Sequence, residues 1–396
     1  MADLPRRNPS LIGGTSSASP QFFLGLVEKV IRASDQQHPA DGVLRAELKA
    51  QSHLPPELRA RVSAAVFAFF RWQGWLDPAK PLSDRIECAL SLADRFTREP
   101  GSFQNSELLA KAVPDWITTV MNVSPAWARA LQSQPKLWLR APRHQGQALA
   151  SQLGDCHLFG SGTLSNTIEY RGHQDLFRTP QFHAGEFELQ DLSSQAVGLI
   201  CNPQPGQTWW DACAGEGGKL LHLSDLMENQ GLIWASDPAT WRLQRLKRRA
   251  ARAKVFNYRA APWNGGPKLP TRTKFDGVLV DAPCSGIGTW QRNPHARWTL
   301  TPTDVRELGQ LQQNILAHAA SAVKPGGKLI YAVCTFTTAE TVEVSNVFSC
   351  QFPEFEQLLL TDPLHHDAPA AAHIEYWPQH HGGIGMFVAA WQRRSP

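Results

Sequence analysis

The sequence predicts an α/β domain preceded by a helical N-terminal domain, and three observations support this prediction. In the first third of the chain apolar residues such as Val62, Val66 and Phe69 recur every three or four positions, the spacing of an amphipathic helix. From residue 187 onward, short apolar runs alternate with amphipathic segments, which is typical of a mostly parallel sheet with helices on both faces. The length of 396 residues suits two or three domains.

Changes in this pattern place the domain boundaries. Residues 1–19 contain no apolar run after their two arginines, so we expect a flexible tail rather than a secretory signal. Residues 20–127 are expected to form the helical domain. Residues 128–186 contain short strand-like runs broken by glycine and polar residues, which predicts a small α+β linker domain. Residues 187–396 remain for the α/β domain.

The composition argues against several classes of protein. No stretch of about 18 apolar residues is present, so a membrane-spanning helix is not expected. The seven cysteines are odd in number and lack C-x-x-C spacing, which argues against a zinc site or a disulfide framework and favours a reducing cytoplasm. We therefore expect a cytoplasmic protein without a bound metal, and we expect it to be a monomer.

Six strands and four helices are expected in the α/β domain. The strands are expected at residues 208–214, 232–237, 255–260, 275–283, 327–335 and 386–392. The helices are expected at residues 219–228, 239–253, 304–322 and 339–348. In such sheets ligands bind beyond the carboxyl ends of the strands, so the residues that follow each strand are the candidates for a site.

A glycine-rich turn follows the first of these strands, between Asp211 and Lys219. Gly215, Gly217 and Gly218 allow the backbone to approach a ligand closely, and free amide groups at the start of the next helix can bind it. The spacing is neither G-x-G-x-x-G nor that of a P-loop, so a dinucleotide or nucleoside triphosphate is not the expected ligand. A tight turn that serves only packing is the alternative.

Asp237 ends the second strand, about 20 residues after the glycine-rich turn, a position that suits hydrogen bonds to the two hydroxyls of a ribose. An aspartate that only caps the following helix is the competing interpretation.

Two cysteines follow neighbouring strands of the predicted sheet. Asp281 ends one strand and Cys284 lies in the proline- and glycine-containing loop after it, while Cys334 ends the next strand. Because the carboxyl ends of adjacent parallel strands meet at one edge, both thiols are expected at the same rim. They could form a covalent catalytic pair beside the aspartate; a disulfide is the other option.

A basic tract extends from Arg242 to Lys254 without an acidic residue. Its cations are Arg242, Arg245, Lys247, Arg248, Arg249, Arg252 and Lys254. So many cations on one helix are not expected to find carboxylate partners nearby, and a phosphate-bearing partner would relieve their repulsion. A solvated helix face is the alternative.

Between residues 187 and 393 the chain resembles the RsmB/NOP2/Sun family of RNA 5-methylcytosine methyltransferases. The resemblance is carried by the glycine-rich turn, by the segment DAPCSG-G at residues 281–288, by the strand from Tyr331 to Cys334 and by GMFVAAWQR near the C-terminus. It implies a class I (Rossmann-like) methyltransferase core, a mostly parallel seven-stranded sheet with one antiparallel edge strand. The helical domain is compatible with the NusB-like domain of some members.

The resemblance also implies a reaction, the transfer of a methyl group from S-adenosylmethionine to carbon 5 of a cytosine in RNA. Cys334 would attack carbon 6, Cys284 would help remove the proton at carbon 5 and release the product, and Asp281 would contact ring nitrogen 3. Lys219 could lower the pKa of a nearby thiol, or could be an ordinary surface lysine of the first helical turn.

The residue patterns and the resemblance together predict two groups of binding residues. The cofactor is expected to bind Cys213, Ala214, Gly215, Glu216, Gly217, Gly218, Lys219, Asp237 and Asp281. RNA, with its target cytosine single-stranded or flipped out, is expected to bind Arg242, Arg245, Arg248, Arg249, Arg252 and Arg292.

Several positions depart from the family pattern. Glu216 replaces a usual proline and places a charge beside the expected cofactor, and Leu220 replaces a usual threonine. Gln291-Arg292 replaces a pair of arginines, and His295 replaces an aspartate. The acid expected to meet adenine is not evident, and Asn264 is the nearest polar candidate.

Three alternatives remain at this stage. The chain could be a non-catalytic RNA-binding assembly factor for ribosomes that kept the fold, or a DNA cytosine-5 methyltransferase. The DNA enzymes are expected to use only the thiol that follows proline, whereas this chain has a second one. Among RNAs, ribosomal RNA is the first expectation and transfer RNA the second.

Overall fold

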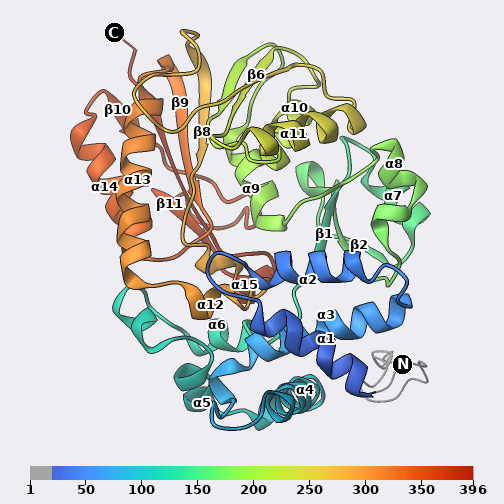
Figure 1. The fold of residues 1–396 in the computed structure, drawn as a ribbon. Coiled ribbons are helices and arrows are strands. Elements are labelled where there is room, and N and C mark those ends of the chain that lie inside the picture. Colours follow the sequence, from blue (N-terminus) through green and yellow to red (C-terminus); the bar gives the residue numbers. More distant parts are fainter. Residues whose placement is uncertain (1–19, 396) are drawn as a thin grey trace. The chain divides into compact units, whose positions relative to one another are not determined.

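The computed structural model describes residues 20–395, so the predicted flexible tail at residues 1–19 lies outside the described residues. The chain divides into two compact units (Figure 1). The first contains Met1–Gln134 together with Trp290–Thr301, and the second contains Pro135–Thr289 and Pro302–Pro396. A segment of twelve residues from the middle of the predicted α/β domain thus belongs to the helical unit.

The helical unit is built from amphipathic helices, as the apolar spacing predicts. Its helices are α1 (Pro20–Arg32), α2 (Ala40–Ala50), α3 (Pro56–Arg71), α4 (Leu82–Arg98), α5 (Asn105–Lys111), α6 (Pro125–Ala130) and the short α12 (Ala296–Thr299). In α3 the predicted core residues Val62, Val66 and Phe69 are buried.

Arg297, in the segment Trp290–Thr301, joins three helix ends of this unit. Its fully buried guanidinium donates to the carbonyl of Leu131 at 2.7 Å, of Ala112 at 3.2 Å and of Arg71 at 3.4 Å. These residues lie at the C-terminal ends of α6, α5 and α3. Helix C-termini carry carbonyls without intrahelical partners and a partial negative charge, so one cation satisfies all three.

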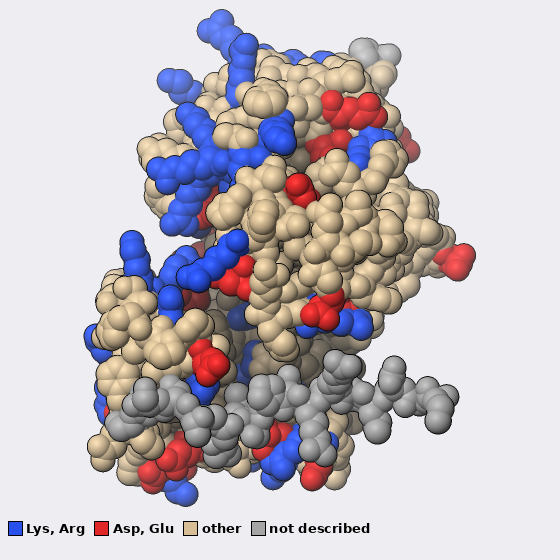
Figure 2. All heavy atoms as spheres, turned by 90° about the vertical axis from the view of Figure 1, so that its right-hand side faces the viewer, with Lys and Arg blue, Asp and Glu red and all other residues tan. Residues whose placement is uncertain are grey.

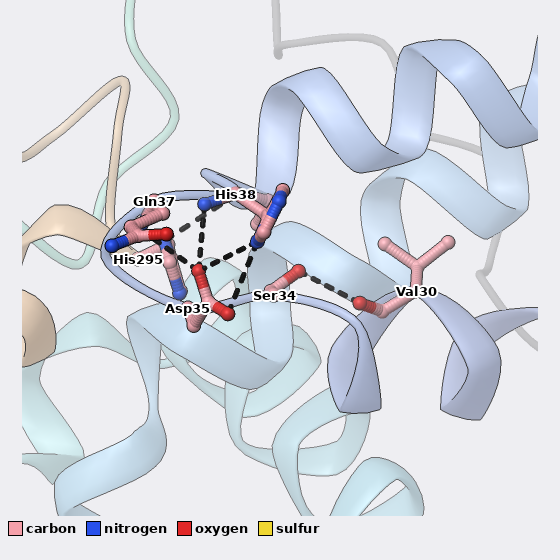
Figure 3. Close-up of polar contacts among 7 residues, drawn as sticks. Val30, Ser34, Asp35, Gln37, His38 and His295 are labelled. Atoms are coloured by element: carbon pink, nitrogen blue, oxygen red, sulfur yellow. Dashed lines mark hydrogen bonds and ion pairs between the residues drawn. The ribbon is translucent and has the colours of Figure 1, made fainter.

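The same segment contacts the start of α2 through His295. Its Nδ1 atom accepts from the backbone N–H of Ala40 at 3.4 Å, and its ring packs edge-on against Phe70. Figure 3 shows the loop before α2, where the Asp35 carboxylate accepts from the ring and the backbone N–H of His38, hydrogen bonds that lower the pKa of Asp35. The polar loop and the inserted histidine therefore fix where α2 begins.

The second unit opens with a small α+β region. Its antiparallel sheet has the order β2-β3-β1-β4. The elements are β1 (Leu137–Arg140), α7 (Gly146–Leu153), β2 (Cys156–Leu158), β3 (Thr167–Tyr170), α8 (Pro180–Ala184) and β4 (Glu188–Leu189). The last strand lies beyond residue 186, and the region shares one compact unit with the α/β core.

The core sheet has the strand order β10-β12-β9-β8-β5-β6-β7, with β11 paired to β12. Its strands are β5 (Thr208–Asp211), β6 (Leu232–Ser236), β7 (Tyr258–Ala261), β8 (Phe275–Asp281), β9 (Val323–Val333), β10 (Phe355–Gln357), β11 (His373–Tyr376) and β12 (Met386–Arg393). The strands from β7 to β9 are parallel, which confirms the predicted fold class.

The sheet differs from the expected one in the number of its strands and in the position of the antiparallel strand. It has eight strands rather than seven, and the antiparallel β12 lies inside the sheet between β9 and β10. The strands β10 and β11 contain only three and four residues, too few for a recognisable alternation. Residues 386–391 are buried, as expected for an internal strand rather than an edge.

Helices cover both faces of this sheet (Figure 1). They are α9 (Leu192–Cys201), α10 (Gly218–Leu226), α11 (Thr240–Arg252), α13 (Pro302–Ala320) and α14 (Val342–Gln351), and the short α15 (Pro378–His381) precedes β12 in the chain. α9, α10 and α11 pack on one face and α13 and α14 on the other. The predicted helix at residues 339–348 begins later, because residues 338–340 form a 3-10 turn.

Candidate active site

A cavity of about 450 Å³ opens at the carboxyl ends of the parallel strands. Its walls come from the loops after β5, β6, β7, β8 and β9, the edge at which α/β sheets bind ligands. Of the residues expected to bind the cofactor, it is lined by Cys213, Ala214, Gly215, Glu216, Asp237 and Asp281. Gly218 and Lys219 line a second, polar cavity of about 190 Å³, which shares Ala214 and Asp281 with the first.

The glycines of the turn have two different roles. Gly217 has a φ of 89° and directly precedes α10, and a Cβ atom on it would lie 2.8 Å from the side chain of Leu246. Packing therefore requires glycine at this position. Gly215 also has a positive φ, but a Cβ atom there would meet no atom within 4 Å. The ligand interpretation thus fits Gly215 and the packing interpretation fits Gly217.

Asp237 does not cap α11, whose N-cap residue is Ala239, and its position is compatible with the ligand interpretation. The side chain is buried at the wall of the cavity, and its Oδ1 accepts from the backbone N–H of Ala239 at 2.8 Å, one residue before α11. Its Oδ2 lies 3.7 Å from Arg242. Asn264 lines the same cavity, as does Trp263.

The two thiols lie together at the rim of the cavity, as expected from the order of the strands. β8 and β9 are neighbours, and the Sγ atoms of Cys284 and Cys334 are 3.2 Å apart. Both cysteines are free, so the disulfide alternative is not realised. The hydrogen bond with Cys334 and burial raise the pKa of Cys284 well above its usual value.

Lys219 is buried and points at the catalytic candidates. Its Nζ lies 2.6 Å from Oδ2 of Asp281 and donates to Ser194 Oγ at 3.2 Å. The interpretation of Lys219 as a surface lysine is therefore wrong. Burial lowers the pKa of this lysine, but the charge of Asp281, its hydrogen bond and the nearby Cys334 outweigh burial and raise the pKa.

Asp211 lies beneath these groups in the polar cavity. It is almost fully buried, and its Oδ1 has no hydrogen-bond partner among the described residues. Burial and the charge of Asp281 raise the pKa of Asp211 to about 7. The acid at the end of β5 thus remains partly protonated at neutral pH, which reduces its repulsion of Asp281.

Glu340 links the two cysteine loops, although the sequence shows only an acid six residues after Cys334. It is fully buried and accepts five hydrogen bonds. The donors are Ser285 N (2.8 Å), Ser285 Oγ (2.5 Å), Thr337 Oγ1 (2.8 Å), Gln312 Nε2 (3.0 Å) and Thr335 Oγ1 (3.2 Å). Ser285 follows Cys284 in the chain and Thr335 follows Cys334. The Glu340 carboxylate therefore holds both cysteine loops in place by hydrogen bonds.

Two further side chains complete this network. Gln312 Nε2 also donates to the carbonyl of Pro283, and the Tyr331 hydroxyl donates to the Gln312 side chain and the Glu340 carbonyl. The hydroxyls at Ser285, Thr335 and Thr337 are the signal in the sequence that could have indicated a buried acceptor between the loops.

The sequence comparisons agree with this geometry. Residues 198–392 match the profile of the 16S rRNA methyltransferase RsmB/F family. A Synechocystis protein named "probable ribosomal RNA small subunit methyltransferase B" is 36% identical over 222 residues, which cover 53% of this chain and 48% of that protein.

Over residues 198–392 the chain is therefore similar to the RsmB/F methyltransferases. A ribosomal RNA small subunit methyltransferase B of Shewanella oneidensis is 32% identical over 260 residues, covering 61% of this chain and 59% of that protein. The chain spans about half the length of the first two curated relatives that it matches.

Solved structures support the fold. The crystal structure of PH0851 matches with a TM-score of 0.78 over 96% of this chain and 100% of that one, at 21% identity. A methyltransferase homologue from Pyrococcus horikoshii matches with a TM-score of 0.58 over 76% of this chain and 99% of that one, at 23% identity.

Two departures from the family pattern are accommodated locally. The Glu216 carboxylate lies 2.6 Å from Arg245, and the Glu216 carbonyl accepts from Arg249. The charge at the cavity is therefore compensated by α11. Leu220 is fully buried in the core beneath the turn, where its apolar side chain packs.

The expectation that the basic tract lacks carboxylate partners is wrong. Four of its seven cations pair with acids that lie before the tract: Arg242 with Asp237, Arg245 with Glu216, and Arg249 and Arg252 with Glu188. Among the described residues, Lys247, Arg248 and Lys254 form no ion pair and are exposed. Arg292 belongs to the helical unit, not to the unit that carries the cavity.

None of the helices in residues 20–395 is long and apolar enough to cross a membrane. The same residues contain no group of three or more His, Cys, Asp or Glu side chains that could hold a metal ion.

Proposed function

We propose that this chain transfers a methyl group from S-adenosylmethionine to carbon 5 of a cytosine in RNA, with ribosomal RNA as the first candidate substrate, through a covalent cysteine adduct. The observation that carries this proposal is the pair of free thiols, 3.2 Å apart, at the rim of a cavity that also contains Asp281. The match to the RsmB/F family model and the names of the relatives support methyl transfer to ribosomal RNA.

The cavity residues fit S-adenosylmethionine. A volume of about 450 Å³ lies in the range of pockets for small ligands. The Asp237 carboxylate would bind the ribose, Asn264 is the candidate for adenine, and the backbone from Cys213 to Gly215 would border the amino-acid portion. The cofactor supplies the methyl group from its sulfonium centre.

The thiols divide the chemistry between them. The thiolate of Cys334 adds to carbon 6, and the resulting electron density at carbon 5 attacks the methyl group. With Cys334 bonded to carbon 6, Cys284 loses the hydrogen-bond partner that raises its pKa in the resting pair, so it can give its thiol proton to solvent. The Cys284 thiolate then accepts the proton from carbon 5, and the bond between carbon 6 and sulfur breaks to return the Cys334 thiolate.

Asp281 and Lys219 act on the pyrimidine ring. Addition at carbon 6 increases electron density at ring nitrogen 3, and a proton or hydrogen bond held there stabilises the adduct. Asp281 contacts nitrogen 3 as an acid, and the proton that it passes to this nitrogen can come from the Lys219 ammonium, whose Nζ lies 2.6 Å from the carboxylate. Lys219 also favours the thiolate form of a nearby cysteine, since a cation stabilises the anion.

RNA must present the cytosine outside a duplex, because the reacting carbons are inaccessible in a stacked helix. The exposed cations of α11, Arg292 and the helical domain are proposed to hold the RNA backbone. The NusB-like character of the helical domain is part of this proposal.

A non-catalytic assembly factor is the rival function, suggested by the altered glycine turn. The ion pair between Glu216 and Arg245 argues against it, because the extra charge is not left facing the cofactor. A DNA-type enzyme is disfavoured because the second thiol would have no role.

The test is methylation by the purified protein with radiolabelled cofactor. RNA from cells that lack the gene should be labelled, duplex DNA should not, and digestion should release labelled 5-methylcytidine. RNA that binds without acquiring label would favour the assembly factor, and label in another nucleoside would overturn the cytosine assignment. Bisulfite sequencing then identifies the target cytosine.

The cofactor site has its own test by calorimetry. Asp237→Ala should weaken binding of S-adenosylmethionine by about 1–3 kcal/mol, the range for lost hydrogen bonds to a charged group. Undiminished binding would remove Asp237 from the site.

A further inference from the structure

The exposed face of α11 carries an aromatic side chain that packing does not explain. The chain has 14 tryptophans, all within the described residues, and Trp241 is the only one that is exposed, with half of its surface accessible. Burying a tryptophan ring contributes a large favourable free energy to folding, and an exposed ring does not make this contribution. An exposed tryptophan therefore commonly marks a binding surface.

The ring of Trp241 is flanked by two arginines. The guanidinium of Arg245 lies 4.8 Å from the ring centroid and that of Arg242 lies 5.4 Å from it. Each arginine also pairs with an acid at the wall of the cavity, Arg245 with Glu216 and Arg242 with Asp237. The indole and the two guanidinium groups are thus held beside the cofactor cavity by contacts to its own wall.

These three side chains remain accessible. Arg242 and Arg245 are each about half exposed despite their ion pairs. Arg248 lies one turn further along the same stripe of α11, since residues 241, 245 and 248 are spaced by four and three, and it forms no ion pair among the described residues. Figure 2 shows Lys and Arg side chains gathered in its upper left part with few acidic ones among them.

The other end of α11 is different. Arg249 and Arg252 pair with the nearly buried Glu188, and the Arg252 guanidinium lies 3.7 Å from the ring centroid of Phe182 in α8. These cations hold α11 to the small α+β region. The two accessible arginines that flank an exposed aromatic ring, Arg242 and Arg245, therefore lie in the N-terminal half of the helix, next to the cavity.

We infer that Trp241, with Arg242, Arg245 and Arg248, forms a stacking surface for an unpaired base of the RNA that flanks the target cytosine. Aromatic and guanidinium planes stack on bases of any sequence, and the cations meet the phosphates, the combination used for single strands. A duplex offers no free base face to this surface. The inference rests on the proposed function, because it assigns an RNA contact to the same site.

The experiment compares Trp241→Ala with Trp241→Phe in the full chain. Affinity is measured by fluorescence anisotropy with an end-labelled single-stranded RNA and with the same sequence as a duplex. Trp241→Ala should bind the single strand about tenfold more weakly, in the range for a lost stacking contact, while Trp241→Phe stays within about threefold and duplex binding is unchanged. Phe256→Ala is the matched control, an exposed aromatic beyond the C-terminal end of α11.

A second readout separates this inference from the proposed function. In the methylation assay Trp241→Ala should raise the KM for RNA and leave the KM for S-adenosylmethionine unchanged. A raised KM for the cofactor instead would overturn the inference and make Trp241 a cover for the cofactor. Equal single-strand binding by Trp241→Ala and wild type would also overturn it. If no RNA is methylated but binding of single-stranded RNA still depends on Trp241, the result supports the stacking surface and contradicts the proposed reaction.

Discussion

The interior behind the two thiols and the surface of α11 are both rich in charge, but the charges are arranged in opposite ways. Glu340 is fully buried and its carboxylate accepts five hydrogen bonds. On α11, Arg242 and Arg245 are half exposed and each has one partner, while Arg248 has none among the described residues. Removing the hydrogen-bond partner of a buried polar group lowers the free energy of unfolding by the full cost of desolvating that group. An exposed ion pair contributes little to the free energy of unfolding, and salt screens it.

Arginines show the same contrast. Arg297 has no acidic partner among the atoms to which it donates, yet it is the central cation of the helical unit because three helix ends surround it. Arg248 has no acidic partner because it faces solvent. A cation without a neighbouring acid in the sequence can therefore be either structural or free to bind a phosphate. Changes in the interior should act strongly and independently of salt, and changes on α11 weakly and with a salt dependence.

The largest effect is expected at the thiols. Cys334→Ala can form no adduct, so turnover should vanish and no RNA should be trapped. Cys284→Ala should still allow attack by Cys334 but stall before release, which leaves a covalent protein–RNA complex that survives denaturing electrophoresis. Trapping in Cys334→Ala and none in Cys284→Ala would reverse the roles and indicate DNA-type chemistry. If both variants retained activity and neither trapped a covalent protein–RNA complex, the covalent mechanism would be contradicted.

Arg297→Met should be the most damaging change to stability. It leaves the carbonyls at the ends of α3, α5 and α6 buried without their shared donor, at a cost of about 3 kcal/mol or more in the free energy of unfolding. Calorimetric unfolding measures the effect, and Arg248→Met is the matched control, with an expected change within about 0.5 kcal/mol. Similar melting temperatures for the two variants would remove the distinction between the buried and the exposed arginine.

Glu340→Gln tests the interior with almost no change in shape. An amide nitrogen in place of one oxygen faces hydroxyl donors at Thr335, Thr337 and Ser285, so the two loops should shift relative to each other. We expect kcat to fall roughly 10- to 100-fold, the scale for a misplaced catalytic group. The KM for the cofactor should change little, and adduct formation in the Cys284→Ala background should slow. Unaltered adduct formation would mean that Glu340 does not position the thiols.

The smallest effect is expected for Arg248→Glu on α11. It should weaken RNA binding several-fold and reduce the slope of log affinity against log salt by about one per lost cation, without a change in melting temperature. Arg249→Glu is the informative comparison, because it places a second carboxylate beside the nearly buried Glu188 and should lower the melting temperature. An unchanged salt slope for Arg248→Glu would assign this residue to a solvated face.

The sequence alone determined the class of fold and most of the cavity. The alternation of strands and helices, the glycine-rich turn and the cysteines after β8 and β9 are local features, and the strand order of a parallel sheet places them at one edge. For this reason the sequence alone predicts that Cys284, Cys334 and Asp281 lie close together. The strands β10 and β11 were missed, since three or four residues carry no measurable periodicity.

Only the tertiary structure decided which charges are structural. Glu188 pairs with Arg249 across 61 residues, Glu340 accepts from Ser285 across 55, and Arg297 donates to Arg71 across 226. Periodicity tells which face of a helix is buried but not which group lies opposite it. The group that lies opposite a cation, an acid or a hydroxyl decides whether that side chain is structural or is available to bind a ligand. This is why the basic tract appeared uniform in the sequence, whereas in the structure Arg249 and Arg252 contact β4 and α8 and the other cations of the tract remain exposed.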